Sequence, residues 1–215
     1  MTRLDRQFFE RYSPLVAREL LGCRLVRMDR GKRLVGIIVE TEAYRGRRDP
    51  ASHAYRGKTM RNAVMFGDAG HAYVYFTMGM HYCLNITTES PGEAGAVLLR
   101  AIKPVEGVEE MARNRGLRDD IHIADGPGRL TKALDIDRRL NGEDLVSSRE
   151  LFVDTGSTPR QIGRSTRVGI SRGAERKWRF FVEGSEFLSQ GRPSSKGPRI
   201  HNYGREKRRR RGVVG

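Results

Sequence analysis

The chain has 215 residues, which suits one domain with a tail, and it is basic, with 41 Lys and Arg against 26 Asp and Glu. Residues 192–215 hold nine Lys or Arg and one Glu, so they carry +8 of the net charge of +15 and leave +7 on the rest of the chain. This charge favours a polyanionic partner, either nucleic acid or an anionic membrane surface. We expect one domain over residues 1–191 and a basic, disordered tail over residues 192–215.

Several features argue against a membrane protein. No apolar run approaches the ~20 residues of a spanning helix, and residues 1–11 are charged and lack the apolar segment of a signal peptide. Cys23 and Cys83 form neither a disulfide framework nor a metal-ligand spacing, so we expect reduced, buried thiols. The sequence thus predicts a cytoplasmic protein with no membrane partner.

The stretch Val39–Tyr44 ends an apolar, β-branched run that begins at Leu34, and this pattern predicts the end of a buried strand. Side chains alternate along a strand, so Glu40, Glu42 and Tyr44 share one face. Ionised carboxylates are rarely buried without partners. This face therefore either opens onto solvent or lines a site, and the spacing alone leaves both alternatives open.

The elements on either side are short. Ser13 and Pro14 are typical of the N-cap and first position of a helix. Residues 23–28 are predicted to pair with the strand that holds Glu42, across the turn at residues 29–32. The polar stretch 45–58 is either a surface loop or one wall of a site.

Residues 72–76 and 81–86 are strand-like, and residues 77–80 form the tip between them. Exposed apolar side chains at a hairpin tip are unusual. Core packing is a reasonable interpretation for Met80, but less so for Met78 beside the turn glycine.

The second half of the chain continues this mixture of elements. Residues 104–115 and 129–134 are predicted as helices, and residues 96–102, 151–153, 167–170 and 178–182 as strands. Neighbouring hairpins with scattered helices predict an α+β fold with a mainly antiparallel sheet.

A series of motifs follows in a fixed order along the chain. They are Val39–Tyr44, His53, Tyr73–Tyr75, Gly79–Met80, Asn85, Val97–Arg100, Asp125–Leu130, Arg167–Gly169 and Trp178–Val182. Together they closely resemble the alkyladenine (3-methyladenine) DNA glycosylase family. The resemblance implies a single compact α+β domain with a curved sheet, surrounding helices and a protruding hairpin that inserts into duplex DNA. It also implies a monofunctional enzyme that flips alkylated or deaminated purines out of DNA and hydrolyses the N-glycosidic bond.

The resemblance further implies catalytic roles. Glu42 matches the carboxylate that activates the attacking water, and Arg100 and the backbone carbonyl of Val168 match groups that help to hold that water. Strand alternation does not separate Glu42 from Glu40, but the position beside Tyr44 and the matching motif favour Glu42. We expect Glu40 to meet an arginine as structural support.

The same resemblance implies a base pocket. Tyr44, His53 and Tyr75 match the aromatic walls that sandwich the flipped base, and Asn85 matches the residue that excludes the exocyclic amine of guanine. The family's hairpin usually presents a tyrosine as the wedge, whereas this chain has Met78. An unbranched apolar side chain still wedges between bases, but it lacks a flat face for stacking, so we expect a shorter-lived flipped state.

Two other functions would use different sets of residues. A metal-dependent nuclease would use Glu40, Glu42, Asp49 and His53 as ligands, but their spacing is not a recognised one and hard cations draw more carboxylates. We therefore expect neither a metal nor a cofactor. A non-catalytic, basic nucleic-acid-binding protein would use the tail and the tyrosine-rich strand as its contact surface.

A glycosylase that also cuts the strand needs a pocket lysine with a lowered pKa. Neither Lys58 nor Lys132 lies in a motif of that kind, so we expect no lyase step. The partner expected is double-stranded DNA with damaged purines, bound by a monomer.

Overall fold

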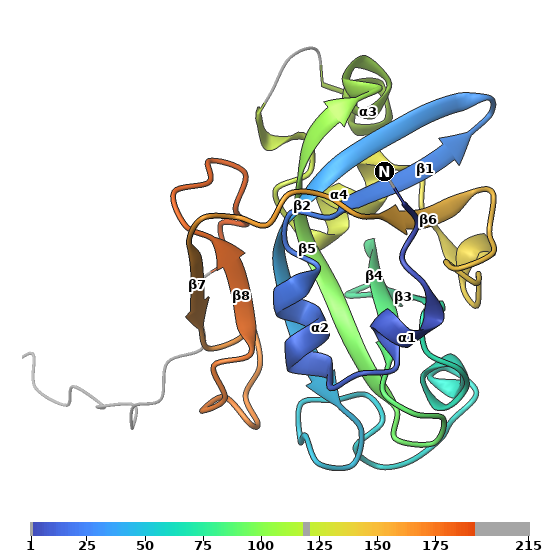
Figure 1. Ribbon diagram of the computed structural model, residues 1–215, viewed down its shortest axis with the longest axis vertical. Helices are drawn as coiled ribbons and strands as arrows, with labels where there is room; N and C mark the ends of the chain where they lie inside the picture. Colours follow the sequence, from blue (N-terminus) through green and yellow to red (C-terminus); the bar gives the residue numbers. More distant parts are fainter. Residues whose placement is uncertain (1, 118–120, 192–215) are drawn as a thin grey trace, which may run out of the picture.

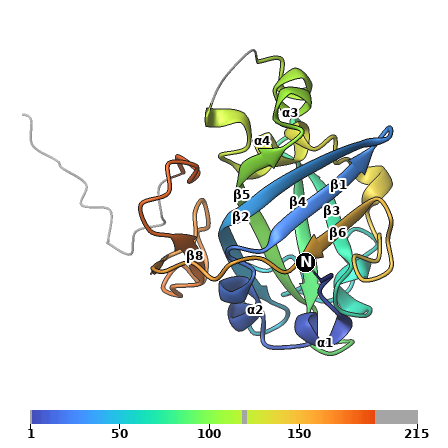
Figure 2. The same ribbon diagram turned by 45° about the horizontal axis from the view of Figure 1, so that its top comes forward.

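The structure is a computed structural model that describes residues 2–117 and 121–191. These residues form a curled antiparallel sheet of eight strands, whose main path runs β3-β4-β5-β2-β1-β6 (Figures 1 and 2). The pair β7–β8 joins the sheet because β8 also pairs with β2. The strands are β1 (Arg24–Asp29), β2 (Lys32–Arg45), β3 (Ala72–Thr77), β4 (His81–Thr88), β5 (Gly95–Glu106), β6 (Leu151–Asp154), β7 (Ile162–Ser165) and β8 (Arg179–Val182). The prediction of an α+β fold with a mainly antiparallel, curved sheet is confirmed.

Short helices surround this sheet. In Figure 1, α2 lies across β2 and β5, whereas α3 and α4 lie at the other end of the molecule. The helices of the described residues are α1 (Arg6–Phe9), α2 (Ser13–Glu19), α3 (Val108–Arg115) and α4 (Pro127–Ala133), with 3₁₀ turns η1 (Ala63–Phe66), η2 (Ile121–Ile123) and η3 (Arg138–Leu140). The main core lies between sheet and helices, where Leu34, Ile38, Leu84, Leu99 and Leu130 are fully buried.

Strand β2 is the longest strand and changes partner along one edge. Its first half pairs with β1 and its second half with β8, while β5 runs along the other edge. The ladder with β5 is irregular, because Glu40 faces Ala101 and Thr41 faces Leu99, which leaves Arg100 without a directly opposite residue. An irregularity of this kind changes the direction in which a side chain points. Here it concerns the one arginine of an otherwise apolar part of β5.

The turn between β1 and β2 explains their pairing. Arg30 and Gly31 both have positive φ, 47° and 77°, as a two-residue type I′ turn requires. The ladder then starts at Asp29 opposite Lys32, and the predicted pairing of residues 23–28 with the following strand is confirmed.

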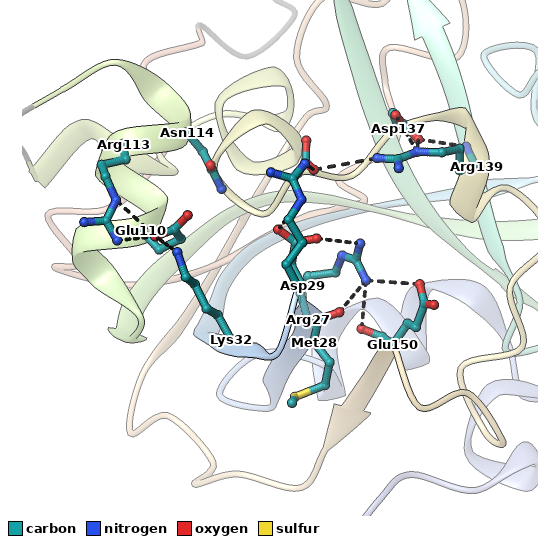
Figure 3. Close-up of polar contacts among 12 residues, drawn as sticks. Arg27, Met28, Asp29, Lys32, Glu110, Arg113, Asn114, Asp137, Arg139 and Glu150 are labelled. Atoms are coloured by element: carbon teal, nitrogen blue, oxygen red, sulfur yellow. Dashed lines mark hydrogen bonds and ion pairs between the residues drawn. The ribbon is translucent and has the colours of Figure 1, made fainter.

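Polar contacts surround this end of the hairpin (Figure 3). The Arg27 guanidinium donates to the carbonyl of Met28 at 2.7 Å, and its Nη1 lies 3.3 Å from Oε2 of Glu150. The Lys32 ammonium lies 2.6 Å from a carboxylate oxygen of Glu110 on α3. Arg27 is buried, whereas Lys32 is exposed, and exposed pairs contribute only ~0–1 kcal/mol each.

Two predictions about helices are wrong in detail. Ser13 is the first residue of α2 and not its cap, because its hydroxyl donates to the buried carboxylate of Glu89 at 2.5 Å. The predicted helix over residues 104–115 is β5 up to Glu106 and α3 only from Val108. Gly107 has a left-handed φ of 68°, which separates the strand from the helix.

The predicted strand over residues 167–170 is also wrong. The strand of this region is β7, Ile162–Ser165, and Gly169 has a φ of 70°, which a regular strand does not accommodate. The predicted tail, residues 192–215, lies outside the described residues. Among the described residues, no helix is long and apolar enough to cross a membrane.

Candidate active site

A cavity of about 300 Å³ lies between the end of β2, the strands β3 to β5 and the segment after β7. Seven of the eight residues predicted for the site line it: Tyr44, His53, Tyr75, Met78, Asn85, Arg100 and Val168. The eighth, Glu42, is fully buried and contacts three of these lining residues. The structure thus brings together all the predicted residues, which span more than a hundred positions of the chain.

The Glu42 carboxylate has three partners. Its Oε1 accepts a hydrogen bond from the backbone N–H of Val168 at 2.7 Å, and its Oε2 accepts one from the Tyr44 hydroxyl at 2.8 Å. Nη1 of Arg100 lies 3.4 Å from Oε2. Burial and the neighbouring Glu42 raise the pKa of Tyr44 well above its ordinary value of 10, so the phenol keeps its proton. These donors satisfy the carboxylate and fix its orientation.

Glu40, two residues earlier, is also fully buried but has stronger partners. Its Oε1 accepts from Nε of Arg100 at 2.8 Å and from Nε of Arg179 at 2.7 Å, and its Oε2 accepts from the N–H of Ser189 at 2.6 Å. Burial alone would raise the pKa of Glu40, but the two guanidinium groups hold it below its ordinary value of 4.5. The prediction that Glu40 meets an arginine is confirmed. Arg179 and Ser189 carried no sequence signal for this contact.

Aromatic rings form the walls of the cavity. The rings of His53 and Tyr75 have centroids 4.6 Å apart and planes at 70° to each other. Because this edge contact leaves no room for a planar group between them, the two rings form one wall. A planar ligand that stacks on both faces would need Tyr44, which lines the cavity from β2, as its second wall.

Residues that the sequence left unassigned complete the first wall. Nδ1 of His53 lies 2.9 Å from the hydroxyl of Tyr73, and the Arg61 guanidinium lies 5.2 Å from the centroid of the Tyr75 ring. Burial, together with Arg61, lowers the pKa of His53, so its imidazole is neutral at pH 7. Burial raises the pKa of Tyr73 to about 12. The wall is therefore uncharged where it faces the cavity.

The cavity lining includes both a polar side chain, Asn85, and the apolar side chain of Met78. The Asn85 side chain is buried and donates to the carbonyl of Tyr73 at 3.2 Å. Burial raises the pKa of the neighbouring Cys83 thiol, and both cysteines of the chain are free and buried, as predicted. At the tip, Met78 and Met80 are 82% and 66% exposed, so Met80 does not pack into the core.

Asp49 does not join the other carboxylates. It is paired with Arg167, whose Nη1 and Nη2 lie 2.5 and 2.9 Å from the two carboxylate oxygens, and both side chains are fully buried. Burial opposes the charge of Arg167, but Asp49 raises its pKa above the ordinary value. Within residues 2–117 and 121–191, no group of three or more His, Cys, Asp or Glu is arranged to hold a metal ion.

Comparison with known proteins identifies the class to which this protein belongs. The model of the methylpurine-DNA glycosylase family matches residues 7–186. The chain belongs to the methylpurine-DNA glycosylase family, so it is an enzyme of DNA repair whose substrate is DNA.

Individual relatives agree with this assignment, and each is named "Putative 3-methyladenine DNA glycosylase". The protein of Carboxydothermus hydrogenoformans is 47% identical over 189 residues, which cover 87% of this chain and 98% of the relative. The protein of Chlorobium phaeovibrioides is 50% identical over 90% of this chain and 100% of its own length. The protein of Methanocella arvoryzae is 46% identical over 90% of this chain and 98% of its own length.

Proposed function

We propose that the chain flips alkylated or deaminated purines, of the 3-methyladenine, hypoxanthine and ethenoadenine type, out of duplex DNA. It then hydrolyses their N-glycosidic bond with a water that Glu42 activates, and it performs no lyase step. The observation that carries this proposal is the position of Glu42, fully buried behind the cavity and oriented by Tyr44, Arg100 and Val168.

The tip and the walls support base flipping. Extruding a nucleotide costs a few kcal/mol, and the exposed Met78 side chain is available to occupy the vacated space. Stacking on aromatic rings contributes roughly 1–3 kcal/mol per base. The wall formed by His53 and Tyr75, with Tyr44 as the second wall, therefore offsets much of the cost of extrusion.

Bond cleavage follows the logic of glycoside hydrolysis. The sugar passes through an oxocarbenium-like state, which a nearby carboxylate stabilises. Glu42 accepts a proton from the water as the water oxygen bonds to the sugar carbon, and the base departs with the electron pair of the broken bond. Arg100 and the carbonyl of Val168 help to hold that water. A cationic base leaves as a neutral molecule, whereas a neutral base also needs a proton or strong hydrogen bonds.

The lining of the cavity favours hydrolysis over a lyase reaction. A Schiff base needs a lysine inside the pocket. In the part of the chain that the structure describes, no lysine lines the cavity, and Lys58 and Lys132 are both exposed. Asn85 lines the cavity with its amide held on the strand, as a residue that excludes the exocyclic amine of guanine requires.

The test is base release from duplex oligonucleotides that contain hypoxanthine or ethenoadenine, and from methylated DNA, with EDTA present. Glu42→Gln is compared with wild type and with Glu109→Gln, an exposed glutamate of α3. We expect Glu42→Gln to lose roughly 10²–10⁴-fold in single-turnover rate and to retain DNA binding, because general-base catalysis contributes an acceleration of that size.

Four outcomes would contradict the proposal or parts of it. Wild-type rates in Glu42→Gln would exclude Glu42 as the base. Inhibition by EDTA would favour a metal-dependent reaction, and borohydride trapping of a covalent DNA adduct would reveal a lyase step. Binding without any base release would leave a basic nucleic-acid-binding protein that has lost the chemistry.

A further inference from the structure

Arg167 is the largest fully buried side chain of the described residues, and the proposed reaction gives it no task. Besides its paired contact with Asp49, its Nη1 donates to the carbonyl of Ala43 at 2.9 Å and its Nη2 to that of Gly173 at 3.1 Å. Four hydrogen bonds thus hold the guanidinium in one place. Burying a charge is costly, so its position calls for a physical reason.

The guanidinium lies against two aromatic rings. Its carbon atom is 4.6 Å from the centroid of the Tyr44 ring and 5.4 Å from that of Trp178. Tyr44 lines the base cavity, whereas Arg167 does not line it and has no exposed surface. The cation is therefore behind the Tyr44 wall, on the side away from the cavity.

The backbone of Arg167 links this contact to the catalytic carboxylate. The next residue, Val168, donates its N–H to Oε1 of Glu42, and the Tyr44 hydroxyl donates to Oε2 of the same group. The Arg167 side chain thus lies against the back of Tyr44. The backbone of Arg167 continues directly to the Val168 N–H that orients Glu42.

A cation on one face of an aromatic ring interacts with the negative π density of that ring. The opposite face is then less attractive to a second cation, such as a flipped 3-methyladenine that still carries its positive charge. A neutral base such as hypoxanthine does not meet this penalty. The Asp49 carboxylate moderates the effect because it pairs with the guanidinium.

We propose that Arg167 is a positioning residue that determines specificity, by holding a guanidinium against the back of the Tyr44 wall and so favouring neutral over cationic bases. This inference rests on the proposed function. Its measure is the ratio of the single-turnover release rates of hypoxanthine and 3-methyladenine from duplex DNA at saturating enzyme.

The two variants change the charged pair behind Tyr44 in different ways, because one removes both charges and the other removes only the carboxylate. Replacing Arg167 alone would leave Asp49 buried without its partner, so Arg167→Gln is combined with Asp49→Asn. This double variant removes the cation, and we expect the ratio to fall roughly threefold to thirtyfold, the range from an exposed to a desolvated cation–π contact. Asp49→Asn alone leaves the cation less compensated, and we expect the ratio to rise.

Arg176→Gln is the matched control. The Arg176 guanidinium lies 4.5 Å from the centroid of Trp178, and its cation–π contact in the described chain is with that ring and not with Tyr44. We expect the ratio of this variant to equal that of wild type. All variants are compared at a temperature at which circular dichroism shows them folded.

The outcomes separate this inference from the proposed function. A parallel fall of both release rates, with the ratio unchanged, would make Arg167 a scaffold residue only and overturn the inference. If the double variant does not fold, Asp49→Asn decides, because an unchanged or lowered ratio contradicts the proposed charge effect. Release of cationic bases alone by the wild type contradicts the bias, whereas release of neither class contradicts the proposed function itself.

Discussion

Glu40 and Glu42 lie on the same face of the same strand, two residues apart, and both are fully buried, yet their surroundings differ. Glu40 has a close guanidinium contact from Arg100 and another from Arg179, as well as a backbone donor. Glu42 has two neutral donors, and its one guanidinium contact is longer, 3.4 Å against 2.8 Å. The comparison shows that two equally buried carboxylates of one strand differ in their charged neighbours and not in their burial.

The largest expected effect is on catalysis at Glu42. We expect Glu42→Gln to reduce the rate of base release by roughly 10²–10⁴-fold. Because Tyr44 and Val168 are neutral donors, the amide keeps much of the local hydrogen bonding. Urea denaturation should therefore show a free energy of unfolding much closer to wild type than that of the matching change at Glu40, and a larger stability loss at Glu42 would break the comparison.

The matching change at Glu40 should affect stability instead. Glu40→Gln leaves the buried Arg179 without its carboxylate, and removing one partner of a buried ion pair costs about 3–5 kcal/mol. Urea denaturation measures this loss, with Glu109→Gln as a surface control expected to stay within about 0.5 kcal/mol of wild type. A Glu40→Gln protein as stable as the control would show that the arginines do not depend on Glu40.

Tyr44→Phe sharpens the comparison by removing one neutral donor from Glu42 while the ring wall remains. A hydrogen bond to a charged group contributes about 1.5–3 kcal/mol. We expect a rate loss of roughly tenfold, a smaller effect than that of Glu42→Gln, and nearly unchanged binding of lesion-containing DNA. A loss of binding with an unchanged rate would instead assign the hydroxyl to the base pocket.

The smallest effect concerns pH. Because the pKa of Glu40 is lower in the folded chain than its ordinary value of 4.5, the unfolded chain binds more protons between these two values. The contribution of Glu40 to the free energy of unfolding is therefore complete above about pH 4.5. It is lost as the pH falls through the lower pKa that Glu40 has in the folded chain. As the pH is lowered from 6 to 3, the free energy of unfolding should fall more steeply in wild type than in Glu40→Gln. Parallel curves would mean that Glu40 does not titrate as described.

Local patterns predicted much of the fold. The positive-φ turn at Arg30 and Gly31 and the alternation along β2 are properties of short segments, so the hairpin and the shared face of Glu40 and Glu42 followed from them. The apolar spacing of residues 104–115 misled, because a half-exposed strand followed by a helix resembles one long helix until the backbone of Gly107 is known.

The candidate site was predicted through its motifs, and the residues behind it were not. Arg167 was assigned to a strand, although its side chain pairs with Asp49, 118 residues earlier. Nothing in a period-two or period-3.6 pattern records such a pairing, since both patterns describe only how a segment divides between core and solvent.

The sequence by itself determined the class of fold, the strand that carries two glutamates and the basic charge that suits DNA. Only the tertiary structure decided which glutamate pairs with two close guanidinium groups. Arg179 and Ser189 reach Glu40 from 139 and 149 residues away, because β8 pairs with the second half of β2. The electrostatic environment of a buried carboxylate depends on these distant partners, and they meet only when the chain has folded.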